Sequence, residues 1–307
     1  MRAPRRPFAS VMASVMAVVM AGAVLGACDL APDWFGGTEA PPLPGQRLSV
    51  LALEGTVEPD PRIADLDVRL PRPYVNKSWP QSGGYPDHAM HHLAGGDRLV
   101  PFWRANIGEG SGDDGRILTT PVVAGGRIFA IDAVAEISAF DADSGVLLWS
   151  IDPRLEDGEE DGFGGGLALA HGLLFASTGF GHVLALDPSN GAVIWRRDIG
   201  IPMRSAPVVA GERVFALTYD NQLWVLAAAD GAVQWSHAGL SETAGLLGAA
   251  VPAVDGDIVI APYSSGELLA FRVENGRTVW TDSLGAQRPG TGSLAALNDI
   301  NGSPVID

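Results

Sequence analysis

The chain has 307 residues, of which 47% are hydrophobic, and its formal net charge is -16 at pH 7. A negative surface of this size repels nucleic-acid phosphates and anionic lipid headgroups, so nucleic-acid binding is not expected. Cys28 is the single cysteine, which rules out a disulfide bond within the chain.

Residues 1–28 have the pattern of an export signal. Three arginines precede an apolar run from Phe8 to Leu25, and Leu-Gly-Ala-Cys follows, ending at Cys28. This arrangement resembles a bacterial lipoprotein signal peptide with its lipobox, in which Cys28 carries the lipid anchor. A plain signal peptide and an uncleaved anchor are the alternatives. Residues 29–75 contain eight prolines among acidic and small residues, which favours a semi-extended tether.

One eleven-residue phrase recurs four times between residues 139 and 280. It reads AFDADSGVLLW from Ala139 to Trp149 and returns as ALDPSNGAVIW, VLAAADGAVQW and AFRVENGRTVW. Each copy places a glycine four positions before a tryptophan, and Trp103 stands one interval upstream of the first copy. The repeats therefore end near Trp103, Trp149, Trp195, Trp235 and Trp280, and a further repeat begins near residue 299. The glycines are Gly145, Gly191, Gly231 and Gly276.

Each repeat is predicted to form four short antiparallel strands. In the first full repeat these are ILTTPVV, RIFAID, EISAFD and VLLWSID, all rich in Val, Ile and Phe and bounded by turn residues. Asp or Asn with Gly before the last strand predicts a tight hairpin. A single sheet cannot bury both of its faces, so we expect the repeats to stack, with each tryptophan ring filling the gap between neighbours.

The phrase resembles the tryptophan-docking repeat of quinoprotein-type eight-bladed propellers. The match is full at Ala139, Asp141, Gly145 and Trp149 and again in the second copy, whereas Ala227 and Arg272 replace the Asp in the later copies. The resemblance implies an all-β propeller over residues 76–307. Because the chain stops inside the first strand of a further repeat, we expect about half of an eight-bladed ring; a complete smaller propeller is the alternative.

Two segments could in principle bind a metal. His88, His91 and His92 cluster in PDHAMHH, and EDGEEDGFGGG at residues 156–166 is acidic. The first lacks supporting ligands at a suitable spacing, so a polar segment packed on the first blade is favoured. The second lacks the bidentate Glu of a calcium loop, which favours a solvated loop. No metal site is therefore predicted.

Enzymatic function is not predicted either. Quinone-dependent dehydrogenases share the propeller, and the resemblance to them implies a vicinal disulfide and a channel calcium that hold the quinone. One cysteine cannot form that disulfide, and the chain has no recognisable catalytic constellation. We expect no cofactor and no catalytic residues, with a quinone-dependent or other ligand-binding propeller as the alternative.

The combination of a lipid anchor, a Pro-rich tether and an acidic propeller resembles the BamB-like lipoproteins of the β-barrel assembly machinery. That resemblance implies a non-catalytic, periplasm-facing scaffold at the outer membrane, which works with BamA, other assembly subunits and nascent outer-membrane proteins. In that family a loop between blades docks on a POTRA domain of BamA, and the matching residues here are Ile201, Met203 and Arg204 in IGIPMRSAP. The alternative is that Met203 packs between blades and Arg204 pairs with an acid. Asp29, directly after Cys28, leaves the inner membrane open as the location.

Overall fold

The computed structural model describes residues 60–62, 66–96, 98–112, 115–155, 162–242, 250–284 and 299–307. The expected signal peptide with Cys28, and most of the expected tether, lie outside these residues. The chain divides into two units, 1–68 and 69–307. In the first, Arg62 pairs with Asp60 at 2.6 Å. Within the described ranges, no helix has the length and apolar character that crossing a bilayer requires.

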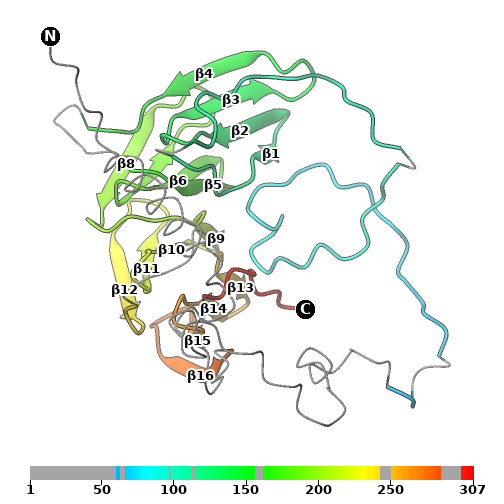
Figure 1. The fold of residues 1–307 in the computed structure, drawn as a ribbon, viewed down its shortest axis with the longest axis vertical. Helices are drawn as coiled ribbons and strands as arrows, with labels where there is room; N and C mark the ends of the chain where they lie inside the picture. The colour runs from blue at the N-terminus through cyan, green and yellow to red at the C-terminus, as the bar shows by residue number, and fades with distance from the viewer. Residues whose placement is uncertain are drawn as a thin grey trace, which may run out of the picture. The chain divides into compact units, whose positions relative to one another are not determined.

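The second unit is built from four sheets of four strands, each joined in simple chain order with antiparallel neighbours (Figure 1). The first two sheets contain β1 (Val122–Ala124), β2 (Arg127–Ile131), β3 (Ile137–Asp141), β4 (Leu147–Ile151), β5 (Gly165–Ala170), β6 (Leu173–Thr178), β7 (His182–Leu186) and β8 (Val193–Asp198). The last two contain β9 (Val208–Ala210), β10 (Arg213–Leu217), β11 (Gln222–Ala227), β12 (Val233–Ala238), β13 (Ala253–Asp255), β14 (Ile258–Pro262), β15 (Glu267–Arg272) and β16 (Thr278–Ser283). The prediction of four-stranded antiparallel units is confirmed.

The hydrophobic cores lie between successive sheets. One core joins the first two sheets, a second joins the middle two, and a third joins the last two. The second and third strands of each sheet supply most of the buried residues, whereas the fourth strand is more exposed, as in β16. Successive sheets therefore bury their facing sides against one another, as stacked repeats require.

The tryptophan of one repeat reaches the turn of the next. The indole N–H donates to a carbonyl of the following repeat in four places, at 2.9 to 3.0 Å: Trp103 to Ala142, Trp149 to Pro188, Trp195 to Ala228 and Trp235 to Val273. The glycine of that following repeat lies directly under the ring. A methyl group on Gly145, Gly191, Gly231 or Gly276 would stand 2.6 to 2.8 Å from the Cε3 atom of the ring above it.

The turn before the last strand is wider than the predicted tight hairpin. In all four sheets the glycine N–H donates to the carbonyl four residues earlier, as from Gly145 to Asp141 at 2.9 Å. In each of these turns only the glycine has a positive φ, +72° at Gly145, and the residue before it does not. Where Asp or Asn stands before the glycine, its side chain instead accepts a backbone N–H group of the turn, as Asp230 does from Ala232 at 2.9 Å. The first strand is also shorter than predicted, because β1 begins only after Pro121.

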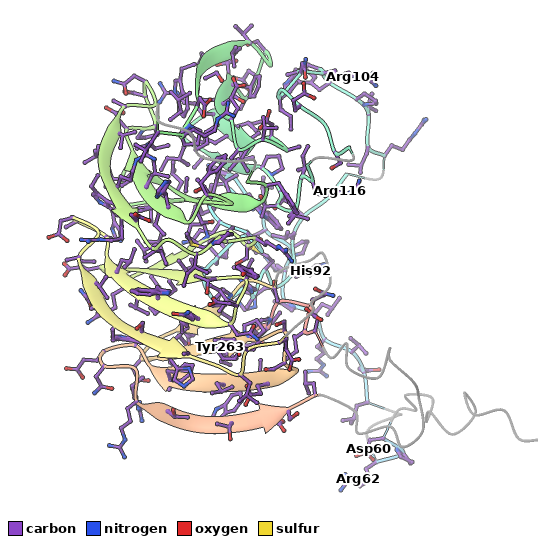
Figure 2. All side chains as sticks on the ribbon, turned by 60° about the vertical axis from the view of Figure 1, so that its left-hand side comes forward. Asp60, Arg62, His92, Arg104, Arg116 and Tyr263 are labelled. Atoms are coloured by element: carbon purple, nitrogen blue, oxygen red, sulfur yellow. The ribbon has the colours of Figure 1, made fainter. Side chains whose placement is uncertain are left out.

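His237 lies between the third and fourth sheets and packs against two aromatic rings. The Nδ1 atom of His237 lies 3.2 Å from the hydroxyl of Tyr263, and its ring centroid lies 4.5 Å from that of Phe271. Tyr263, labelled in Figure 2, is fully buried between these sheets. Burial lowers the pKa of His237 below its usual 6.5, although the nearby Glu267 carboxylate opposes the shift. The folded protein therefore favours the neutral imidazole.

We expect the free energy of unfolding to fall as the pH drops below 6.5, because the unfolded chain then binds a proton that the folded chain resists. Above that pH the contribution is fully present. His237→Gln should weaken this dependence when urea unfolding is compared at about pH 7.5 and about pH 5.5. The buried His88, whose pKa is also lowered by burial, should leave a remaining slope of the same sign. An unchanged slope in the variant would contradict the assignment to His237.

Candidate partner-binding site

The three residues predicted to bind a partner lie in the connection between β8 and β9, residues 199–207. This connection is held by main-chain hydrogen bonds on both sides. Met203 N donates to Thr178 O at 3.1 Å, and Tyr219 N donates to Pro202 O at 2.9 Å. It is therefore fixed between the β6–β7 turn of the second sheet and the β10–β11 turn of the third.

Met203 does not lie on the surface. Its side chain has no exposed area and belongs to the core between the second and third sheets. Its backbone forms an isolated bridge with Thr218. In this structure the side chain fills space between the two sheets, as the alternative interpretation expects, and a contact of Met203 with a partner stays a prediction.

Arg204 lies over two aromatic rings. Its guanidinium carbon is 5.8 Å from the ring centroid of Phe163 and 5.6 Å from that of Tyr219. Both distances are within the range in which a cation is attracted to an aromatic face. Tyr219 is 53% exposed, and Ile201 is partly exposed beside the exposed Pro202. These five residues, Phe163, Ile201, Pro202, Arg204 and Tyr219, are called the Arg204 surface below.

Two glycines and a short polar network shape this surface. A methyl group on Gly164 would stand 3.1 Å from Arg204 Cα, and one on Gly181 would stand 2.7 Å from Ile201 N. Asp220, next to Tyr219, accepts a hydrogen bond from Thr218 Oγ1 at 2.5 Å and one from Gln222 Nε2 at 2.8 Å. The aromatic ring at position 219 is thus presented by a braced turn rather than by a free loop.

Phe163 and Tyr219 were missed by the sequence reasoning. Phe163 belongs to the segment that was interpreted as a solvated acidic loop, and Tyr219 belongs to a turn without any motif. One feature of the sequence could have indicated them: each is an aromatic residue in an otherwise polar or Gly-rich connection. Large aromatic side chains are uncommon in connections that are fully exposed to solvent. Their proximity to Arg204 depends on how two sheets stack, and no local pattern encodes it.

The histidine cluster is spread over different partners. His88 Nδ1 lies 2.7 Å from the carbonyl of Pro304, and His92 Nδ1 lies 2.6 Å from that of Pro71. His91 is exposed and stands 3.8 Å from a carboxylate oxygen of Asp307. Within the described residues, no group of three or more His, Cys, Asp or Glu side chains is arranged to hold a metal ion. Of the acidic segment, residues 156–161 lie outside the described part of the chain.

The sequence is similar to that of a known protein family. The family model for "Outer membrane protein assembly factor BamB" matches residues 135–307. The curated protein of that name from Yersinia pestis is 28% identical over 209 residues, which cover 66% of this chain and 53% of the relative. The chain spans about half the length of the curated relatives that it matches.

Two solved structures share the fold. The crystal structure of BamB from Moraxella catarrhalis superposes with a TM-score of 0.54 at 22% identity, covering 61% of this chain and 55% of that chain. The quinohemoprotein alcohol dehydrogenase ADHIIG from Pseudomonas putida HK5 superposes with a TM-score of 0.51 at 16% identity, covering 67% and 40%. At these identities the similarity concerns the fold alone, and it confirms the predicted all-β propeller architecture.

Proposed function

The chain belongs to the family of the outer membrane protein assembly factor BamB, and from this premise we propose that it is a non-catalytic scaffold in the assembly of outer-membrane proteins. The Arg204 surface is its docking site. The arrangement of Arg204 over Phe163 and Tyr219 is the observation that carries the assignment. It presents a cation and an exposed aromatic ring together, and Arg and Tyr are enriched among the residues that dominate protein interfaces.

The partner that we propose is a POTRA domain of BamA. Arg204 keeps a fork of N–H donors that can bind a carboxylate or a main-chain carbonyl of the partner. Tyr219 and Ile201 offer apolar area next to it. The protein has a formal charge of -16, and the Arg204 surface contains a single cation. A partner that presents several carboxylates is therefore disfavoured by charge repulsion. Other assembly subunits and nascent outer-membrane proteins complete the proposed set of partners.

The proposed location is the periplasmic side of the outer membrane. Residues 1–28 are the signal peptide, Cys28 carries the lipid, residues 29–75 form the tether and residues 76–307 form the propeller part. Two or more acyl chains on Cys28 would give the stable anchoring that a single chain does not. Asp29, directly after Cys28, leaves the inner membrane open as an alternative location. Separation of the inner and outer membranes by density, followed by detection of the protein, distinguishes the two.

Charge reversal at the docking site should reduce partner capture. We expect Arg204→Glu to weaken binding to purified BamA POTRA domains by tenfold or more, because the loss of an arginine that acts as an interface hot spot costs roughly 2 kcal/mol or more. Tyr219→Ala should weaken binding in the same direction. The measurement is a titration by biolayer interferometry with the immobilised chain.

Arg277→Glu is the matched control, since it makes the same charge change at an exposed arginine on the β15–β16 turn, at the other end of the strands. Its affinity should stay within about twofold of the parent protein. Equal affinities for the parent protein, Arg204→Glu and Tyr219→Ala would remove this surface from the interface.

A further inference from the structure

A segment that precedes the first sheet runs along the first strands of all four sheets. Trp79 and Val123 of β1 exchange two main-chain hydrogen bonds, at 2.6 Å and 2.8 Å. Leu169 N of β5 then donates to Pro80 O at 2.7 Å. The sequence predicted that the His-bearing residues 86–92 pack on the first blade, whereas Pro86, Asp87 and His88 contact β13 and residues 304–306.

The third sheet is held by a side chain instead of the backbone. Gln81 Nε2 donates to Val209 O at 2.8 Å, and Val209 N donates to Gln81 Oε1 at 2.9 Å. Gln81 is only 4% exposed. One amide side chain thus satisfies both main-chain groups of a β9 residue, as a neighbouring strand would.

The same pattern continues in the fourth sheet and beyond it. Val254 N of β13 donates to Pro86 O at 2.7 Å, and Ile306 N donates to Asp87 O at 2.9 Å. His88 adds its contact with the Pro304 carbonyl. Residues 304–306, Pro-Val-Ile, match the Pro-Val-Val of residues 207–209, so Ile306 corresponds to Val209. The contacts therefore fall on five successive repeats.

The five residues held in this way share one place in their repeats. Val123, Val209 and Val254 are the middle residues of β1, β9 and β13, and Leu169 is the residue before the last in β5. In every sheet the first strand pairs with the second on one side only. The other side presents main-chain N–H and C=O groups, and an uncovered edge of this kind is open to another strand.

The composition of the segment suits this task. Pro80 and Pro86 supply carbonyl acceptors and have no N–H group that would itself need a partner. Gly83 and Gly84 have φ values of +75° and +95°, and a methyl group on either would stand within 2.6 Å of the side chain of His88 or Met90. Only glycine allows the chain to turn this closely between the third and fourth sheets.

We propose that residues 79–88 form an edge strap, a built-in segment that covers the first-strand edges of five successive repeats, joins them into one cooperative unit and closes these edges to extended peptides. A partner strand that binds by main-chain pairing would then have to use the fourth-strand edges or the loops. In an ordinary repeat stack each unit contacts only its neighbours. The edge strap adds a connection that crosses several units at once.

Amide hydrogen exchange tests the edge strap on the full chain. In the parent protein we expect the amides of Val123, Leu169, Val209, Val254 and Ile306 to exchange at least tenfold more slowly than the outward-facing amides of β16, because the former are hydrogen-bonded to the strap. Exchange of these five amides at the rate of the β16 amides would overturn the proposal without any variant.

Gln81→Ala tests whether the strap acts as a unit. It removes both bonds to Val209, so the Val209 amide should exchange about tenfold faster or more. Since the strap detaches as one segment, the amides of Leu169 and Val254 should accelerate with it. Gln234→Ala, at an exposed glutamine of β12, is the matched control and should change none of them. Acceleration confined to Val209 would overturn the cooperative role.

Discussion

Replacement of Trp195 by alanine is expected to lower the free energy of unfolding by about 3–5 kcal/mol. The ring is only 9% exposed and belongs to the core between the second and third sheets. Its centroid lies 6.0 Å from that of Phe175, and its N–H donates to Ala228 O at 3.0 Å. The variant loses the apolar burial, leaves a cavity between two sheets and leaves a buried carbonyl without its donor. Urea unfolding followed by far-UV circular dichroism measures the loss.

Trp280→Ala is the internal control for this expectation. Trp280 occupies the same position in its repeat but lies on the exposed strand β16 and is itself 40% exposed. We expect a loss of about 1 kcal/mol or less, because a half-exposed side chain gives up little burial when it is removed. Similar losses in the two variants would show that the docked position of Trp195 contributes nothing beyond the presence of an indole on the fourth strand.

The sheets could be predicted from the sequence because their determinants are local. The four-residue spacing from Gly145 to Trp149 recurs in each of the four sheets, because each has the same turn before its fourth strand and the same tryptophan on that strand. The bounds of β2, β3 and β4 lie within the predicted runs for the same reason, since alternating apolar residues and turn residues define a strand directly. The first strand was predicted too long, because only the ladder with β2 decides where pairing begins.

The same glycine also had a second role that the turn pattern concealed. The sequence indicated a tight hairpin at Gly145, which is a reason within one repeat. The structure adds the ring of Trp103 from the previous repeat above it. A contact between repeats leaves no separate mark in the sequence when the residue that makes it already satisfies a local requirement.

The candidate site was only partly predictable for a related reason. The connection that carries Ile201 and Arg204 was identified from resemblance, but its local pattern does not say which side chains point outward. Met203 is buried in the core between the second and third sheets, where its backbone bridges to Thr218, the residue after β10. The ring of Tyr219 reaches Arg204 only after the second and third sheets have stacked. Such relations are properties of the stacked structure.

Gly231→Ala should be the more damaging member of a pair of otherwise similar substitutions. Gly231 has a φ of +68°, and a methyl group there would stand 2.7 Å from Cε3 of Trp195. We expect a loss of about 2–5 kcal/mol, of which about 1–2 kcal/mol reflects the left-handed backbone and the rest reflects overpacking against the ring. Urea unfolding measures the total, and the fluorescence of Trp195 should change as the ring is displaced.

Gly211→Ala isolates the contribution of the ring. Gly211 has a φ of +54°, close to that of Gly231, and a methyl group there would meet no atom within 4 Å. Gly211→Ala should lower the free energy of unfolding only by the cost of the left-handed backbone, about 1–2 kcal/mol. Because the backbone penalty is common to both variants, the difference between them measures the contact between a glycine and the tryptophan of the preceding repeat. A difference near zero would mean that these glycines serve their turns alone and that the sheets are held together by the apolar cores without the docked rings.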